Sequence, residues 1–241
     1  IQTPLDINND YGLIKFSAAC SLNNESKIEY KDGQYNVIGQ PTEAALKVLV
    51  EKLNKGEQSI INNNNNSTLP INDHYYHKLY DILATIEFSR GRKSMSTLVY
   101  NKEVQQNELF VKGAPESILE RCNYIQLRNN KIVKLTNKHR QLIQDETLRL
   151  ASTPLRTLAC AYKIDLGTLL NNYNGQTTHN AHSLLSGDPD KIGYDIENDL
   201  IYLGLVGIKD PARPEVAESI KRCNIAGIRV IMITGDKKET A

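Results

Sequence analysis

Four short segments of the sequence place polar or charged side chains beside the expected ends of strands and helices. They are residues 39–46, 87–95, 110–116 and 155–159, and they contain the cationic residues Arg90, Lys93, Lys112 and Arg156. Because the formal net charge is only +1, no general field attracts anionic partners such as nucleic acid to this protein. A site for an anionic ligand must therefore be built locally, from segments such as these.

Each segment taken alone also has a simpler interpretation. Lys112 could be a solvated charge at a strand end, and Arg90, Arg92 and Lys93 could form an ordinary exposed turn. Phe88 could be a plain core residue. Whether these residues do chemistry therefore depends on the elements that position them.

Hydrophobic periodicity predicts those elements. A helix is expected over 42–53, capped by Thr42, because Leu46, Leu49, Val50 and Leu53 share one face. The remaining patterns predict strands over 84–88, 95–100, 108–112, 156–164 and 200–208, a hairpin over 124–135, and helices over 115–122 and 136–150. This order predicts an α+β fold, mostly antiparallel sheet flanked by helices.

The pattern of expected elements changes at Asp210. A helix is expected to end near Cys223, and the apolar run 228–233 is typical of a buried parallel strand. We therefore expect one domain over 1–209 and part of a second, α/β domain over 210–241. Polar stretches near 55–70 and 169–198 are expected to be surface insertions, the second a loop with a short helix near 181–185.

Several other classes of protein are disfavoured by the sequence. The four cysteines form no CxxC pair, so we expect buried, reduced thiols, and the paired histidines at 74/77 and 179/182 lack fixed partners, so we expect no metal site. No apolar run approaches the roughly 20 residues that span a bilayer. The motifs of P-loop NTPases and protein kinases are absent.

Taken together and in order, the segments resemble the P-type ATPases, and within them the calcium pumps of sarcoplasmic and endoplasmic reticulum. The motifs that carry the resemblance are EFSR-x-RKSM (87–95), FVKGAPE (110–116), LRTLA (155–159), DP-x-R (210–213) and IRVIMITGD (228–236). The segment GQPTEAALKVLVEKLN (39–54) is most similar to the calcium-pump branch. The resemblance covers nearly the whole chain outside the two polar insertions. It implies a nucleotide-binding domain followed by a stub of a haloacid-dehalogenase-like phosphorylation domain.

The resemblance also implies a site for ATP. Phe88 resembles the aromatic residue that stacks on adenine, and Glu43, with Thr42 beside it, resembles the carboxylate that reads the adenine amino group. Arg90 and Lys93 resemble basic residues near the nucleotide and its phosphates, Lys112 resembles the lysine of the pocket, and Arg156 resembles the arginine that grips phosphate. Gly113 and Ala114 would let the ligand approach the backbone closely.

Thr234 resembles the hydroxyl donor to a transferred phosphoryl group, and Asp236 belongs to the same loop. The family's phosphorylated aspartate sits in DKTGT and its magnesium motif is GDG-x-ND, and neither occurs in this chain; Lys237 also stands where the calcium pumps carry Asn. The chain is therefore expected to bind ATP without turning it over.

For the full-length protein, the resemblance implies ATP and Mg²⁺ as cofactors, Ca²⁺ as the transported ion, and phosphorylation, actuator and transmembrane domains as partners. It places this region at the cytosolic face of the endoplasmic reticulum membrane. The alternatives are another P-type pump, for Na/K or H, and a non-catalytic module whose basic turn binds an acidic partner. A complete phosphatase of the dehalogenase class is disfavoured, because no nucleophile motif is present.

Overall fold

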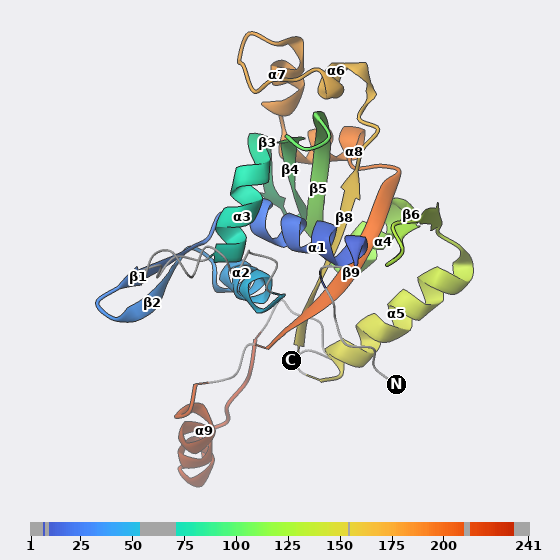
Figure 1. The fold of residues 1–241 in the computed structure, drawn as a ribbon. Helices are drawn as coiled ribbons and strands as arrows, with labels where there is room; N and C mark the ends of the chain where they lie inside the picture. The colour runs from blue at the N-terminus through green and yellow to red at the C-terminus, as the bar shows by residue number, and fades with distance from the viewer. Residues whose placement is uncertain (1–6, 8–9, 54–70, 154, 210–212, 234–241) are drawn as a thin grey trace.

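The computed structural model describes residues 7, 10–53, 71–153, 155–209 and 213–233. Its centre is one sheet with the strand order β3-β4-β5-β8-β9-β6-β7. Neighbouring strands are antiparallel except β6 and β9, which are parallel. The strands are β3 (Tyr80–Ser89), β4 (Ser94–Asn101), β5 (Gln106–Gly113), β6 (Cys122–Gln126), β7 (Ile132–Lys134), β8 (Leu155–Lys163) and β9 (Leu200–Lys209). A separate hairpin, β1 (Lys27–Lys31) and β2 (Gln34–Ile38), projects beside the sheet (Figure 1).

Helices cover both faces of this sheet (Figure 1). One face carries α1 (Tyr11–Leu22), α2 (Pro41–Leu53) and α3 (Ile71–Leu79). The helices of the opposite face and of the connection from β8 to β9 are α4 (Pro115–Arg121), α5 (Asn137–Ala151), α6 (Gly167–Asn171), α7 (Asn180–Leu185) and α8 (Pro189–Ile196). The last helix, α9 (Val216–Ile225), extends away from the sheet (Figure 1).

Alternation along the central strands builds a separate core on each face. In β5, Leu109 and Val111 pack with Ile118 of α4 on one face, whereas Phe110 packs with Phe16 and Cys20 of α1 on the other. Successive strand residues point to opposite faces, so Glu108 and Lys112 share the α1 face with Phe110. Lys112, one of the expected site residues, therefore points into the space between the sheet and the helices α1 and α2.

The predicted α+β architecture is confirmed. The helix expected over 42–53 is α2, the strands expected over 84–88, 95–100, 108–112, 156–164 and 200–208 are β3, β4, β5, β8 and β9, and the hairpin over 124–135 is β6 and β7. Thr136 caps α5 as expected, accepting a hydrogen bond from the backbone N–H of His139.

Three expectations about local structure were wrong. Thr42 is not an N-cap: α2 already begins at Pro41, whose fixed φ suits a first turn, and the Gln40 carbonyl accepts from the N–H groups of Glu43 and Ala44. Residues 228–233 form no strand and are exposed, because no strand of the described chain lies beside them to pair with. The stretch 169–198 is not mainly a surface loop: besides the short helix expected near 181–185, which is α7, it contains α8, and α8 contributes Ile192 and Ile196 to the core.

The structure also contains elements that the sequence patterns did not predict, namely α1, α3 and the β1–β2 hairpin. Most residues of α1 are buried on all sides, so it lacks the one-sided pattern that marks a surface helix. Three cysteines, Cys20, Cys122 and Cys160, are free and buried as expected, whereas Cys223 is partly exposed.

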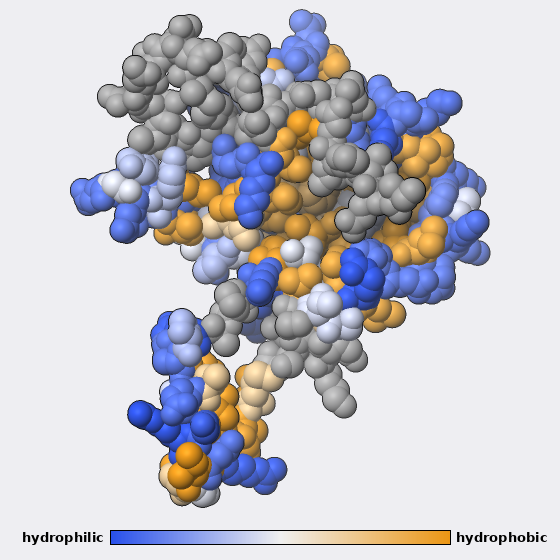
Figure 2. Space-filling view, turned by 60° about the horizontal axis from the view of Figure 1, so that its bottom comes forward, coloured by the Kyte–Doolittle hydropathy of each residue, from blue (hydrophilic) through white to orange (hydrophobic). Residues whose placement is uncertain are grey.

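Apolar side chains gather on one face of the molecule and along the projecting C-terminal segment (Figure 2). That segment exposes Ile225 of α9 and Ile228, Ile231, Met232 and Ile233 beyond it. Among the residues that the structure describes, no helix has the length and apolar character needed to cross a bilayer.

Candidate functional site

The beginning of α2 carries two of the expected site residues, Thr42 and Glu43. Gly39 precedes it with φ +106°, where a Cβ would lie 2.8 Å from Ser26 Oγ, so glycine lets the chain turn tightly into the helix. The Glu43 carboxylate lies 2.5 Å from the Lys112 ammonium through Oε1, and its Oε2 accepts from the Glu25 N–H at 3.0 Å. The start of α2 therefore places the Glu43 carboxylate against β5 of the sheet.

Lys112 reaches this carboxylate from β5. Its side chain is 7% exposed, and its Nζ also donates to the backbone carbonyl of Asn23. Asn23 in turn donates from Nδ2 to the Met95 carbonyl at 2.9 Å and accepts from Thr97 Oγ1 at 3.0 Å. Lys112 is thus a buried, paired cation that joins α1, α2 and the sheet.

Arg156 joins the same group from the start of β8. Its exposed guanidinium donates from Nη1 to Thr42 Oγ1 at 3.1 Å. Thr42 therefore contacts the expected phosphate-binding arginine instead of capping its helix. Four of the expected residues, Thr42, Glu43, Lys112 and Arg156, lie together although they span more than a hundred positions in the sequence.

The β3–β4 turn brings the other expected residues near this group. Phe88 is 60% exposed, and Arg90 and Lys93 are also exposed. In the strand register Met95 lies opposite Lys112, and Ser94 lies opposite Gly113. Phe88 on β3 is therefore about two strand spacings, roughly 10 Å, from the β5 end that carries Lys112.

Gly113 and Ala114 hold the turn against β5. A Cβ at Gly113 would overlap the Lys93 carbonyl oxygen, and the Ala114 N–H donates to that same oxygen at 3.0 Å. The room at Gly113 is thus taken by the backbone of the turn. Lys93 itself adopts a left-handed φ of +53°, and its ammonium lies 3.9 Å from the Glu116 carboxylate.

Arg92, which could have been one more exposed turn residue, is fully buried and paired with Glu197. No sequence signal singled out Glu197 or Asn23. Both lie in segments without a recognisable motif, and only the fold brings them to the turn and to Lys112.

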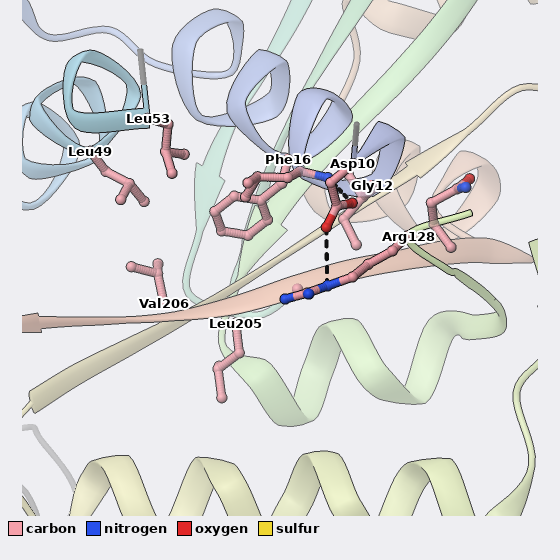
Figure 3. Close-up of a pocket in the computed structure, with 12 residues that line it drawn as sticks. Asp10, Gly12, Phe16, Leu49, Leu53, Arg128, Leu205 and Val206 are labelled. Carbon is pink, nitrogen blue, oxygen red and sulfur yellow. Dashed lines mark hydrogen bonds and ion pairs between the residues drawn. The ribbon is translucent and has the colours of Figure 1, made fainter. Parts of the chain in front are cut away.

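An apolar pocket lies elsewhere in the described part of the chain. It has a volume of about 310 Å³ and is lined by Phe16, Leu49 and Leu53 of the helices and by Leu205 and Val206 of β9, with the Asp10–Arg128 ion pair of 3.1 Å at one end (Figure 3). None of the expected site residues that the structure describes lines it. These residues instead lie around the start of α2, the end of β5, the start of β8 and the β3–β4 turn.

Thr234 and Asp236 lie outside the described residues, as does the Asn-rich stretch within 55–70. Within the described part of the chain, no group of three or more His, Cys, Asp or Glu side chains is arranged to hold a metal ion.

Comparison with known proteins points in one direction. A family profile described as "P-type ATPase, cytoplasmic domain N" matches residues 12–215. Among curated proteins, "Calcium-transporting ATPase 2, endoplasmic reticulum-type" of Arabidopsis thaliana is 40% identical over 97% of this chain and 23% of its own length. "Endoplasmic reticulum calcium ATPase srcA" of Aspergillus fumigatus is 41% identical over 88% of this chain and 21% of its own length. The chain thus spans less than a quarter of the length of these relatives.

Proposed function

The chain belongs to the P-type ATPases, whose cytoplasmic domain N its residues 12–215 match, and from this premise we propose that it binds ATP. The domain that performs this binding spans residues 1–209 in our proposal, and residues 210–241 begin the phosphorylation domain. The larger protein is an endoplasmic-reticulum-type calcium pump that couples ATP hydrolysis, with Mg²⁺, to Ca²⁺ transport. This region then lies at the cytosolic face of that membrane and works with the actuator, phosphorylation and transmembrane domains.

One observation supports the proposal above all others. The fold gathers a carboxylate, a lysine, an arginine and a hydroxyl, from Glu43, Lys112, Arg156 and Thr42. Within this group, the β5 end that carries Lys112 lies about two strand spacings from Phe88, whose ring is exposed. An aromatic face beside a carboxylate suits a nucleobase that carries an amino group, because the ring stacks and the carboxylate accepts. Cationic side chains at the far end suit the phosphates.

In this proposal, different residues contact the base and the phosphates of the nucleotide. Phe88 offers an exposed face for the base, and Glu43 is held in place by Lys112, so that its carboxylate is already oriented when the base arrives. Arg156, Arg90 and Lys93 are exposed cations that would meet the phosphate chain, where a guanidinium can donate to two oxygens at once. These residues bind and orient the nucleotide, and Mg²⁺, when bound, neutralises charge on the phosphates.

Calorimetric titration of the 241-residue chain with ATP tests the proposal. We expect saturable binding that Phe88→Ala weakens for ATP, ADP and AMP alike, because all three share the base; stacking contributes roughly 1–3 kcal/mol. Tyr35→Ala is the matched control, since Tyr35 is 62% exposed on the β1–β2 hairpin, away from the site. Absence of ATP binding by the wild-type chain, or equal effects of the two substitutions, would contradict the proposal.

A further inference from the structure

Helix α8 docks onto the β3–β4 turn through charged and polar contacts at both of its ends. The helix lies in the connection from β8 to β9 and packs beside β3. The turn it contacts is the one that exposes Phe88, Arg90 and Lys93. The helix itself contributes none of the expected site residues.

At the C-terminal end of α8, the Glu197 carboxylate is fully buried among donors. Its Oε1 accepts from Arg92 Nη1 and Ser96 Oγ, and its Oε2 accepts from Arg121 Nη1 at 2.5 Å and from Ser94 Oγ at 2.7 Å. Arg92 and both serines belong to the turn or to the first residues of β4. One carboxylate therefore bonds the inward-facing side of the turn at three positions.

The two arginines extend these bonds to the backbone of the turn. Arg92 Nη2 donates to the Glu87 carbonyl, directly before Phe88, and Arg121 Nη2 donates to the Arg92 carbonyl at 2.7 Å, directly before Lys93. The peptide groups that adjoin two of the expected ligand-binding residues are thus tied to guanidinium groups. Both guanidinium groups are oriented by Glu197.

At the N-terminal end of α8, Asp190 contacts the start of the same turn. Its Oδ1 accepts from Ser89 Oγ, and Ser89 Oγ accepts in turn from the Arg92 N–H at 3.2 Å. A Cβ at Gly91 would lie 2.7 Å from Asp190 Oδ2, and a Cβ at Gly193 would overlap the side chain of Arg92. The turn thus has a glycine, Gly91, against the Asp190 side chain of α8, and α8 has a glycine, Gly193, against the Arg92 side chain of the turn.

The charged contacts between α8 and the turn are not needed to hold α8 against the apolar core. Ile192 and Ile196 already anchor α8 to the apolar core, and burying a carboxylate and a guanidinium without close pairing is costly. The paired charges do, however, fix the backbone on either side of Phe88 and Lys93. Rigidity of that backbone matters for binding, because a ligand loses affinity in proportion to the time its site spends in other conformations.

We infer that Glu197 is a positioning residue for nucleotide binding. Through Arg92 and Arg121, and with Asp190 at the other end of α8, it holds the β3–β4 turn so that Phe88, Arg90 and Lys93 face the nucleotide together. The inference rests on the nucleotide-binding function proposed above. It gives α8 a role in ligand affinity although α8 touches no ligand.

The test combines ATP affinity with the mobility of the turn. ATP affinity is measured by calorimetry on the wild-type chain and on Glu197→Gln, which preserves the shape of the side chain and removes its charge. Since the chain contains no tryptophan, Phe88→Trp provides a single indole fluorophore on the turn, whose time-resolved anisotropy is measured with and without Glu197→Gln. We expect Glu197→Gln to weaken ATP binding roughly tenfold, as when the competent turn is populated a tenth of the time, and to speed local depolarisation of the indole.

Glu108→Gln is the matched control, because Glu108 also forms a buried ion pair, with Lys15, but on the face of the sheet opposite to α8. It should change neither ATP affinity nor the mobility of the indole introduced by Phe88→Trp. If Glu197→Gln fails to fold, Asp190→Asn, at the less buried end of α8, should give a smaller change of the same kind.

Two results would overturn the inference while leaving the proposed function intact. One is wild-type ATP affinity and unchanged indole anisotropy in Glu197→Gln, or in Asp190→Asn where that variant replaces it. The other is an equal loss of affinity in Glu108→Gln, which would assign the effect to general destabilisation. Failure of the wild-type chain to bind ATP is a separate result that would overturn the proposed function and this inference with it.

Discussion

Glu43 and Lys112 are counterions of each other, which changes what each can offer to a ligand. The ammonium of Lys112 is shared between the Glu43 carboxylate and the Asn23 carbonyl, and its side chain is almost wholly shielded from water. The family resemblance assigns Lys112 to the ligand pocket. In the structure it is better suited to orient Glu43 than to react with reagents in solution, because a nucleophilic amine must be both uncharged and reachable.

A double-mutant cycle tests this coupling. Glu43→Gln and Lys112→Met should each lower the free energy of unfolding, because each leaves a largely buried partner without its counterion; removing one member of a buried pair costs about 3–5 kcal/mol, and less where a partner is partly exposed. The double variant should recover part of the loss, with a coupling of at least about 1 kcal/mol. Urea denaturation of the four proteins measures it. Strictly additive losses would mean that the two charges do not depend on each other.

Arg156 should discriminate among nucleotides by their phosphates. Its guanidinium is exposed and always charged, so Arg156→Ala should weaken ATP more than AMP, and the difference should shrink at high salt as the charges are screened. Titrations of both nucleotides at two salt concentrations measure this. Arg149→Ala is the control, because Arg149 is an exposed arginine paired with Glu146 on α5. Equal weakening of ATP and AMP by Arg156→Ala would remove Arg156 from the phosphate end of the site.

At the scale of the element, α1 shows how a helix without an amphipathic pattern is anchored. Its Lys15 ammonium lies 2.5 and 2.7 Å from the two carboxylate oxygens of Glu108 on β5 and donates to Tyr80 Oη at 3.2 Å. The ring centroids of Tyr80, Phe110 and Tyr162 lie 5.5, 5.9 and 5.7 Å from the same ammonium. The aromatic faces and the carboxylate together compensate for the desolvation of the lysine.

Removing the carboxylate should therefore destabilise the whole domain. Glu108→Ala leaves Lys15 charged and buried, and we expect a loss of about 3–5 kcal/mol in the free energy of unfolding. Glu146→Ala, which breaks the exposed pair with Arg149 on α5, should cost no more than about 1 kcal/mol. Denaturant titrations compare the two variants directly. Similar small losses would show that α1 is held by apolar packing alone.

At the scale of the whole molecule, the sequence predicted what depends on local pattern and missed what depends on distant contact. The strands β3, β4, β5, β8 and β9 and the helix α2 carry clear periodicity, and α2, β3, β5 and β8 among them bear most of the expected site residues that the structure describes. The placement of Glu43 on Lys112 and the burial of Arg92 depend instead on pairings across 69 and 105 positions. No local pattern encodes such pairings. The run 228–233 shows the reverse error, since an apolar pattern becomes a strand only where a neighbouring strand is present.

Whether this chain can turn over the nucleotide that we propose it binds is also a question about the whole molecule. Phosphoryl transfer depends on a nucleophile and a metal ion positioned in line with the γ-phosphate. The chain contains neither the DKTGT sequence nor the GDG-x-ND sequence that the family resemblance associates with those roles, and the roles that we propose for the described site residues are only to bind and orient the nucleotide. Purified chain with ATP and Mg²⁺ should therefore release phosphate at the background rate while binding ATP saturably. Thr234→Ala should leave both the background release and the affinity unchanged, because a hydroxyl donor has no transferred phosphoryl group to stabilise without the nucleophile. Sustained phosphate release that disappears in Thr234→Ala would show that this chain carries a complete reaction centre of its own.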